Sequence, residues 1–286
     1  MQPVRPWSFP GVFVMVRALS SVQRTLRDAW SHRSLVAALT AREIAARYKG
    51  STLGVLWAIL LPLLMLATYT LVFSVVFRAR WPSLGGSKGE FALVLFAGLL
   101  VFNLFAECVN RAPTLVLQNA SYVKKVVFPL EVLPVVSLAA AVFNAALSYL
   151  VWQVFALFVF GIPPWTVLLL PLLLLPVCLF TLGLSWIAAA LGVYVRDLAQ
   201  LTAVVTGALM FLSPIFYPLS ALPESYQPLL ALNPLAGVIE AVRNALLWGK
   251  LPDTWTYLIQ LLGSAVIAWV GLAFFQRMRK GFADVV

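Results

Sequence analysis

Long apolar runs, separated by short polar or proline-containing stretches, dominate the chain. Six of these runs have about the length that an α-helix needs to cross a bilayer, roughly 20 residues. They lie at 54–77, 91–112, 133–160, 166–192, 198–217 and 255–276. The third and fourth runs are joined by the short connection "FGIPPW" (160–165), so we expect them to form a helical hairpin. The pattern predicts an all-α integral membrane protein with six transmembrane helices.

Two amphipathic segments precede the first run. Residues 1–33 carry apolar residues at helical spacing with arginines between them, which is typical of a basic helix on a membrane surface; a solvated extension is the alternative. Residues 34–49 predict a second, interface helix that lies along the membrane with Tyr48 at headgroup level. One of its faces carries Ala37, Ala41, Ile44, Ala45 and Tyr48. The other carries Arg42, Glu43, Arg47 and Lys49, and is interrupted by Leu35, Val36 and Leu39.

The stretch 213–250 breaks the simple pattern of spans. It is apolar, but five prolines fall within 21 residues, so one straight helix is excluded. Residues 235–248 keep a helical period, and Asn233 and Pro234 are suited to be the N-cap and first residue of that helix. Glu240 and Arg243 are placed to pair on it. We expect short re-entrant helices before the last span; an irregular loop is the alternative.

The connection 119–134 after the second run also carries helix signals. Asn119 or Ser121 can cap a short helix that extends to Val127, and two prolines, Pro129 and Pro134, then return the chain to the membrane. The side chains expected to contact a partner are Tyr122, Lys124, Lys125, Val126 and Phe128. An ordinary basic loop is the alternative interpretation.

Composition and charge support membrane insertion. The 286 residues are 62% hydrophobic and 10% charged, whereas soluble domains carry about a quarter charged residues. The net charge of +10 fits loops beside anionic lipid and gives no reason to expect nucleic acid as a partner. Fifteen of the 20 lysines and arginines fall on the side of both termini, which places both termini in the cytoplasm.

Several kinds of chemistry have no motif in the sequence. It contains no GxxxxGK[ST] phosphate loop, no HExxH and no Cys/His cluster; the lone His32 and the separated Cys108 and Cys178 predict neither a metal site nor a disulfide framework. Glu107 and Arg111 stand at i,i+4 near the end of the second run and are expected to pair. An intramembrane enzyme and an ion-coupled transporter are therefore disfavoured, and no cofactor is expected in this chain. If the protein moves a substrate, we expect the energy to come from another chain.

Five stretches, taken in order, resemble the membrane subunit of ABC-2 type polysaccharide exporters over residues 33–280. They are "LTAREIAARYKGSTLGVLWAILLPLL", "LFAGLLVFNLFAE", "QNASYVKKVVFPLEVLPV", "SPIFYP" and "LNPLAGVIEAVRNALLWG". Such subunits export O-antigen, capsule or teichoic acid polymers across the bacterial inner membrane. The resemblance implies two copies of the subunit, with ATP and Mg²⁺ held by two separate ATPase subunits. It also implies a transmembrane domain at 34–280, with an interface helix at 34–49, a coupling helix at 119–129, gate helices at 213–250 and a cytoplasmic tail at 281–286.

Candidate site residues follow from this resemblance. Arg42, Arg47 and Lys49 suit the pyrophosphate of a lipid-linked sugar chain, although a basic membrane anchor explains the same charges. Aromatic side chains that could stack on a passing sugar chain, or face lipid instead, are Trp57, Tyr69, Phe73, Phe102, Phe105, Phe211, Phe216 and Tyr217. Asn233, Pro234, Glu240 and Arg243 are the gate candidates, and Tyr122, Lys124, Lys125 and Phe128 the ATPase-coupling candidates.

The cargo expected first is an O-antigen-type polymer, followed by capsule and teichoic acid. An ABC-2 exporter of drugs or small lipids is the alternative within the transporter class. A membrane-embedded glycosyltransferase and a passive channel are the alternatives from other classes.

Overall fold

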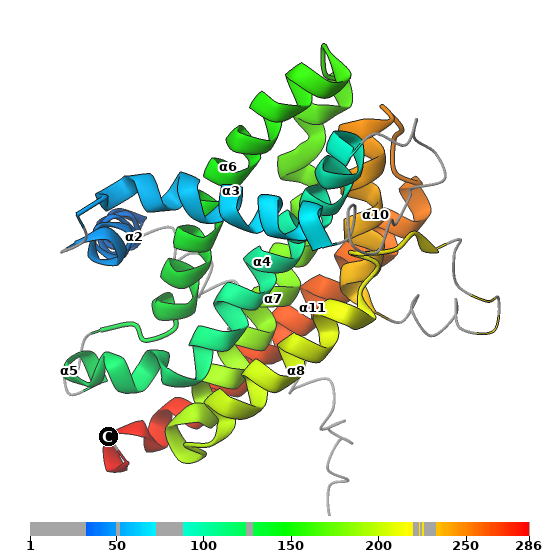
Figure 1. The fold of residues 1–286 in the computed structure, drawn as a ribbon. Helices are drawn as coiled ribbons and strands as arrows, with labels where there is room; N and C mark the ends of the chain where they lie inside the picture. Colours follow the sequence, from blue (N-terminus) through cyan, green and yellow to red (C-terminus); the bar gives the residue numbers. More distant parts are fainter. Residues whose placement is uncertain are drawn as a thin grey trace, which may run out of the picture.

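A computed structural model describes residues 33–49, 52–72, 88–123, 128–219, 223, 225 and 233–285, and these residues are helical or irregular, without a strand (Figure 1). The α-helices are α2 (Arg33–Tyr48), α3 (Trp57–Tyr69), α4 (Lys88–Gln118), α5 (Ala120–Val123), α6 (Val132–Phe160), α7 (Leu170–Tyr194), α8 (Leu198–Leu212), α10 (Pro234–Leu247) and α11 (Thr254–Met278). Short 3-10 turns occupy Gly54–Leu56, Trp165–Leu169 and Arg279–Asp284. The predictions for residues 1–32, Phe73, Lys124 and Lys125 lie outside the described residues.

Four helical stretches of the described chain are long and apolar enough to cross a membrane. They are Gly89–Gln118, Val132–Phe160, Trp165–Tyr194 and Thr254–Phe282, and they match the second, third, fourth and sixth predicted spans. At the first and fifth positions lie the shorter apolar helices Trp57–Val72 and Leu198–Leu212. Six complete spans therefore stay a prediction.

The predicted end of the fifth span at residue 217 is wrong. Helix α8 ends at Leu212, and Ser213 has extended backbone angles because Pro214 follows it. Its 15 residues give a helix of about 22 Å at 1.5 Å per residue, less than the roughly 30 Å of a bilayer core.

Helix α4 is the centre of the bundle. In its most apolar part 83% of the residues are buried, compared with 28–33% in the other three long helices. It runs through the middle of the fold and packs against α6, α7, α8 and α10 (Figure 1). Because every residue from Phe91 to Phe102 is buried, this part of α4 has protein on all sides.

Helices α7 and α11 approach so closely that their backbones meet. A Cβ atom at Gly271 would lie 2.2 Å from the carbonyl oxygen of Gly183. At the end of the bundle where the C-terminus lies, Phe275 and Phe282 pack with Trp186 of α7. There Arg279 forms an ion pair of 2.7 Å with Glu131, which immediately precedes α6. The C-terminal segment therefore fixes the start of α6.

The short helix α10 begins as the sequence predicts. The side-chain oxygen of Asn233 accepts the backbone N–H of Leu235 at 3.0 Å, and Pro234 is the first helical residue, so the predicted cap is confirmed. One face of α10 is buried against α4 and α7. Its place at the outer membrane surface stays a prediction.

Candidate functional site

Helix α2 occupies the segment where an interface helix is predicted, and it packs against α6. Its outward side carries the small residues Ala37, Ala41 and Ala45, which are exposed. Glu43 and Arg47 lie on the partly covered side, together with the leucines that interrupt the polar face in the sequence. The charged face of α2 therefore turns in part toward the bundle, where charged side chains of α4 pair with it.

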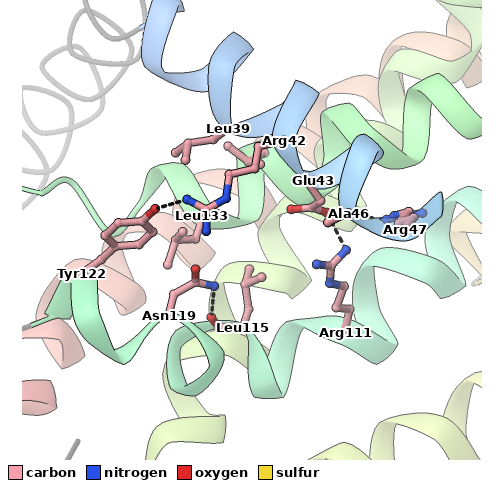
Figure 2. Close-up of a pocket in the computed structure, with 11 residues that line it drawn as sticks. Leu39, Arg42, Glu43, Ala46, Arg47, Arg111, Leu115, Asn119, Tyr122 and Leu133 are labelled. Carbon is pink, nitrogen blue, oxygen red and sulfur yellow. Dashed lines mark hydrogen bonds and ion pairs between the residues drawn. The ribbon is translucent and has the colours of Figure 1, made fainter. Parts of the chain in front are cut away.

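Four charged side chains join α2 to α4, and Figure 2 shows three of them: Glu43, Arg47 and Arg111. Arg111 of α4 donates to a carboxylate oxygen of Glu43 at 2.5 Å, and Arg47 lies 3.5 Å from the same oxygen. Arg47 also forms an ion pair with Glu107. Their side chains keep between 13% and 33% of their surface exposed, so water screens each pair and weakens it. The cluster is thus a solvated network between two helices.

Asn144 of α6 extends this network. Its amide nitrogen donates to both carboxylate oxygens of Glu107, at 3.3 and 3.2 Å. Its amide oxygen accepts the hydroxyl of Tyr48 at 3.2 Å. One polar chain therefore connects the end of α2 to the middle of α6 and to α4.

The predicted pairing of Glu107 with Arg111 is wrong. Each of the two bonds a residue of α2 instead: Glu107 bonds Arg47, and Arg111 bonds Glu43. An i,i+4 pair within one helix gains only about 0.2–0.5 kcal/mol. When α2 docks, its alternating charges offer both α4 side chains a partner with better geometry, so the pairing within α4 is lost.

A cavity of about 330 Å³ opens beside these ion pairs. Helices α2 and α4, the following α5 and the start of α6 line it, and three arginines, Arg42, Arg47 and Arg111, contribute to its wall (Figure 2). Among these three arginines, Arg42 is the exposed one, and it donates a hydrogen bond of 3.3 Å to the hydroxyl of Tyr122. Lys49, the third predicted phosphate ligand, is exposed outside the cavity.

The coupling candidates Tyr122 and Phe128 stack on one another, and Tyr122 also lines this cavity. Their rings are 4.3 Å apart and nearly parallel, at 10°. Asn119, expected as a helix cap, instead donates its side-chain amide to the carbonyl of Leu115 at 2.8 Å and so closes the end of α4. Helix α5 is described over four residues only, Ala120–Val123.

A second cavity, of about 450 Å³, lies between α3, α4 and α6 and also reaches Arg47 and Tyr48. Of the eight aromatic residues predicted along a sugar path, Trp57 lines it. Phe102 and Phe105 do not: they are 4% and 1% exposed, and Phe105 stacks on Phe180 of α7. Within the subunit these two rings are core, because they lie on the sides of α4 that α7 and its neighbours cover.

Four of the remaining aromatic candidates lie close together at the C-terminal end of α8. The ring of Phe216 lies 5.8 Å from Tyr69 and 5.6 Å from Phe211. The Tyr217 hydroxyl donates to the carbonyl of Phe211 at 3.0 Å. Phe211 is 65% exposed and so available to a ligand or to lipid.

The gate candidates Asn233 and Arg243 both hold the turn after α8. Asn233 donates its amide to the Ser213 hydroxyl at 2.9 Å. Arg243 is fully buried and donates to the carbonyls of Val94 at 3.0 Å, Ile215 at 2.5 Å and Pro214. The predicted partner Glu240 contributes a nearby negative charge.

Comparison with known proteins identifies the family of the chain. A family model described as "ABC-2 type transporter" matches residues 34–247. The chain belongs to the ABC-2 type transporter family. The resemblance suggested by the sequence is therefore confirmed, and the chain is a membrane subunit of a transporter and not itself an enzyme.

Relatives of this ABC-2 transporter cover almost its whole length. The O-antigen export system permease protein RfbA of Myxococcus xanthus is 32% identical, over 92% of this chain and 99% of that protein. A protein of the same name from Klebsiella pneumoniae is 29% identical, over 88% and 95%. The polysialic acid transport protein KpsM of Escherichia coli is 26% identical, over 84% and 92%.

Asn144 is the site residue that sequence reasoning missed. It is a lone amide in the apolar run 133–160, and a polar side chain inside a predicted span is a signal of function or of helix association. Glu43 was assigned to a surface of α2 without a role, because its partner Arg111 is 68 positions away.

Proposed function

We propose that this protein is the membrane subunit of an ATP-driven exporter of lipid-linked polysaccharide. The observation that carries the proposal is its similarity over nearly full length to permeases named for O-antigen export. An O-antigen-type polymer is therefore the first cargo to test. Capsule polymers come next, because the more distant relatives are named for polysialic acid transport, and teichoic acid follows.

The working assembly contains two copies of this chain and two ATPase subunits that bind ATP and Mg²⁺. It sits in the bacterial inner membrane with both termini in the cytoplasm. The absence of a phosphate loop from the sequence supports a separate ATPase. Apolar side chains exposed on α3 and α8, such as Leu64, Leu201 and Phe211, support contacts with lipid and with the second copy.

The cavity of about 330 Å³ is the entry point for the phosphate end of the lipid carrier in this proposal. Arg42 meets the phosphate, because it is exposed and its guanidinium can donate two parallel hydrogen bonds to phosphate oxygens. Lys49 adds positive charge at the membrane surface. Arg47 acts mainly as a positioning residue, since Glu43 and Glu107 already hold it.

The coupling and gate elements keep the roles expected for them. The stacked pair of Tyr122 and Phe128 presents the segment 119–129 to the ATPase. Tyr122 of this pair also lines the arginine cavity. Motion of the ATPase can therefore reach α2 through the hydrogen bond between Arg42 and Tyr122. The stretch 213–250 forms the exit gate on the opposite side.

Deletion of the gene tests the proposal. The deletion strain should lose its surface polymer and accumulate lipid-linked polymer inside the cell, and a plasmid copy should restore export. Normal surface polymer in the deletion strain would exclude the export role. Normal polymer combined with sensitivity to drugs or altered lipid distribution would favour the alternative ABC-2 cargo.

A further inference from the structure

The surface of α4 differs from its interior in one respect. Within the described stretch from Glu90 to Val116, the exposed residues are Asn103 and Asn110, and the remaining positions are buried or partly covered. The two amides are seven residues apart, which is two helical turns, so they lie on the same side of α4. The side chains that this stretch of α4 exposes are therefore amides, although its composition is mostly apolar.

Polar residues continue this side of α4 along its length. Glu107 and Thr114 lie between and beyond the two amides and are partly exposed, and Gln118 at the end of the helix is exposed. We call Asn103, Glu107, Asn110, Thr114 and Gln118 the polar stripe of α4. Asn103 is near the middle of the apolar stretch Gly89–Gln118. An amide that faces hydrocarbon at this depth loses its hydrogen bonds to water, which is unfavourable unless a polar partner or water lies against it.

Asn103 and Glu107, the N-terminal part of the polar stripe, line the 450 Å³ cavity between α3, α4 and α6. Where α4 and α6 line this cavity, its polar groups are the amides of Asn103 and Asn144, the Ser148 hydroxyl and the Glu107 carboxylate, set among apolar side chains. The opposite wall is supplied by α3 and carries Trp57, Pro62 and other apolar residues. The cavity is within the size range of small-molecule sites, about 300–1,000 Å³.

These two walls match the two faces of a sugar ring. Hydroxyl groups at the rim of a sugar donate and accept hydrogen bonds, as amides do, while its C–H face packs on an aromatic ring such as the Trp57 indole. Glu107 and Arg47, which also line the cavity, pair with one another, so their opposite charges balance and the cavity has no net charge. A cavity without net charge suits a chain of uncharged sugars that must slide and not bind tightly.

Asn110, further along the polar stripe, contacts α8. The hydroxyl of Thr206 donates to the amide oxygen of Asn110 at 2.7 Å, and it is the buried residue of an otherwise open helix. Asn110 keeps its amide nitrogen for another partner. The stripe therefore lies beside α3 and α6 at Asn103 and beside α8 at Asn110.

We propose that the polar stripe of α4 is the glycan-facing surface of the translocation path, and that the cavity of Asn103, Asn144, Ser148 and Trp57 holds one sugar unit of the moving chain. The inference rests on the proposed export function and adds which residues meet the cargo. It moves the contact on α4 from Phe102 and Phe105, which are core, to Asn103 and Asn110. The ligand class is a hydroxyl-rich, uncharged sugar.

Cysteine labelling tests the exposure that this proposal requires. Asn103→Cys and Asn110→Cys should react with a membrane-impermeant, water-soluble thiol reagent in inverted membrane vesicles that contain the complete transporter. The native Cys108 on the buried side of the same helix is the internal control and should stay unlabelled. Labelling should be at least about fivefold slower in vesicles from cells that make the polymer than in those from a polymer-synthesis deletion strain.

Three labelling results would overturn the proposal. Reaction with lipid-soluble maleimides alone would place the stripe against lipid. Efficient disulfide cross-linking of Asn103→Cys between two copies would make it a contact between subunits. Equal labelling with and without polymer would leave no role for a sugar chain.

Export by leucine variants provides an independent measurement. Asn103→Leu keeps the number and branching of the side-chain heavy atoms but cannot form hydrogen bonds. It should lower the export rate roughly tenfold, because the sugar chain loses its polar contacts at this position. Asn103→Gln, which keeps an amide but places it one methylene further out, should recover only part of the lost export. The control Phe143→Leu, at an exposed position of α6 outside the cavity, should export normally at equal membrane abundance.

The outcomes separate the two proposals. If the wild-type protein does not export polymer, the proposed function fails. If the wild-type protein exports polymer and Asn103→Leu exports it equally well, the proposed function stands and the glycan-facing stripe is refuted.

Discussion

Arginine occurs in two contrasting environments in this transporter. Arg243 of α10 is fully buried, and backbone carbonyls of α4 and of the turn after α8 accept its hydrogen bonds. Arg47 and Arg111 are partly exposed, and side-chain carboxylates on a neighbouring helix hold them. The guanidinium group of Arg243 is therefore anchored by buried backbone carbonyls, whereas those of Arg47 and Arg111 link α2 to α4 through partly solvated ion pairs.

The difference lies in what replaces each arginine's contact with water. At Arg243 the carbonyls have no access to solvent once the arginine is removed, so each loses a partner at a cost of about 1–3 kcal/mol. At the α2–α4 cluster water can solvate either side of a broken pair, and exposed pairs contribute only about 0.2–1 kcal/mol. We therefore expect Arg243 to contribute more to stability than any single ion pair of the cluster.

Substitution of Arg243 by leucine should have the largest effect. Arg243→Leu leaves the carbonyls of Pro214 and Ile215 without the arginine donor, and the Val94 carbonyl keeps only its bond within α4, so we expect destabilisation by about 3–5 kcal/mol and loss of export. Thermal unfolding in detergent and membrane abundance measure the change. Arg243→Lys, which can satisfy only part of this geometry, should be intermediate. Wild-type stability of Arg243→Leu would show that the carbonyls find other partners.

A smaller perturbation of the same region is available at Gly98. A Cβ atom there would lie 2.6 Å from Nη2 of Arg243 and 3.4 Å from Cγ2 of Ile239, so α10 can approach α4 only because this position is glycine. Gly98→Ala should destabilise the protein by about 1–3 kcal/mol, measured as a lower midpoint of thermal unfolding. Gly207→Ala, on α8 with no atom within 4 Å of its added Cβ, is the matched control and should be neutral or slightly stabilising. Equal effects of the two substitutions would contradict the close packing around Arg243.

Local signals in the sequence predict local structure well in both regions. The cap at Asn233 and Pro234 was predictable because it depends on two adjacent residues. The carbonyl partners of Arg243 were not, since Val94 lies 149 positions away. At the other site the charges of α2 were visible in the sequence, but their pairing with α4 depends on how α2 docks. Burial of Phe102 and exposure of Asn103 likewise follow from helix packing and not from residue type.

The weak coupling expected between the ion-paired side chains of α2 and α4 can be tested by a double-mutant cycle. Glu43→Gln, Arg111→Gln and the double variant remove the 2.5 Å contact between α2 and α4 from either side and from both. We expect a coupling energy of no more than about 1 kcal/mol in thermal unfolding, because both side chains are partly exposed. Export should fall in each single variant if α2 must move together with α4. A coupling energy as large as the effect of Arg243→Leu would make the two arginine environments equivalent.

The smallest effect on stability is expected at Arg42. This side chain is exposed and donates one hydrogen bond of 3.3 Å, to Tyr122, so Arg42→Gln should change the free energy of unfolding by at most about 0.5 kcal/mol. Its effect on export should nevertheless be large if the guanidinium binds the phosphate end of the cargo. Arg42→Lys keeps the charge but loses the bidentate fork, so it should recover only part of the export. Tyr122→Phe removes the same hydrogen bond and keeps the ring that stacks on Phe128, so it separates the two roles of Arg42. Full export by Arg42→Gln would leave this arginine as a membrane anchor, whereas loss of export by Tyr122→Phe alone would assign its role to the contact with the coupling segment.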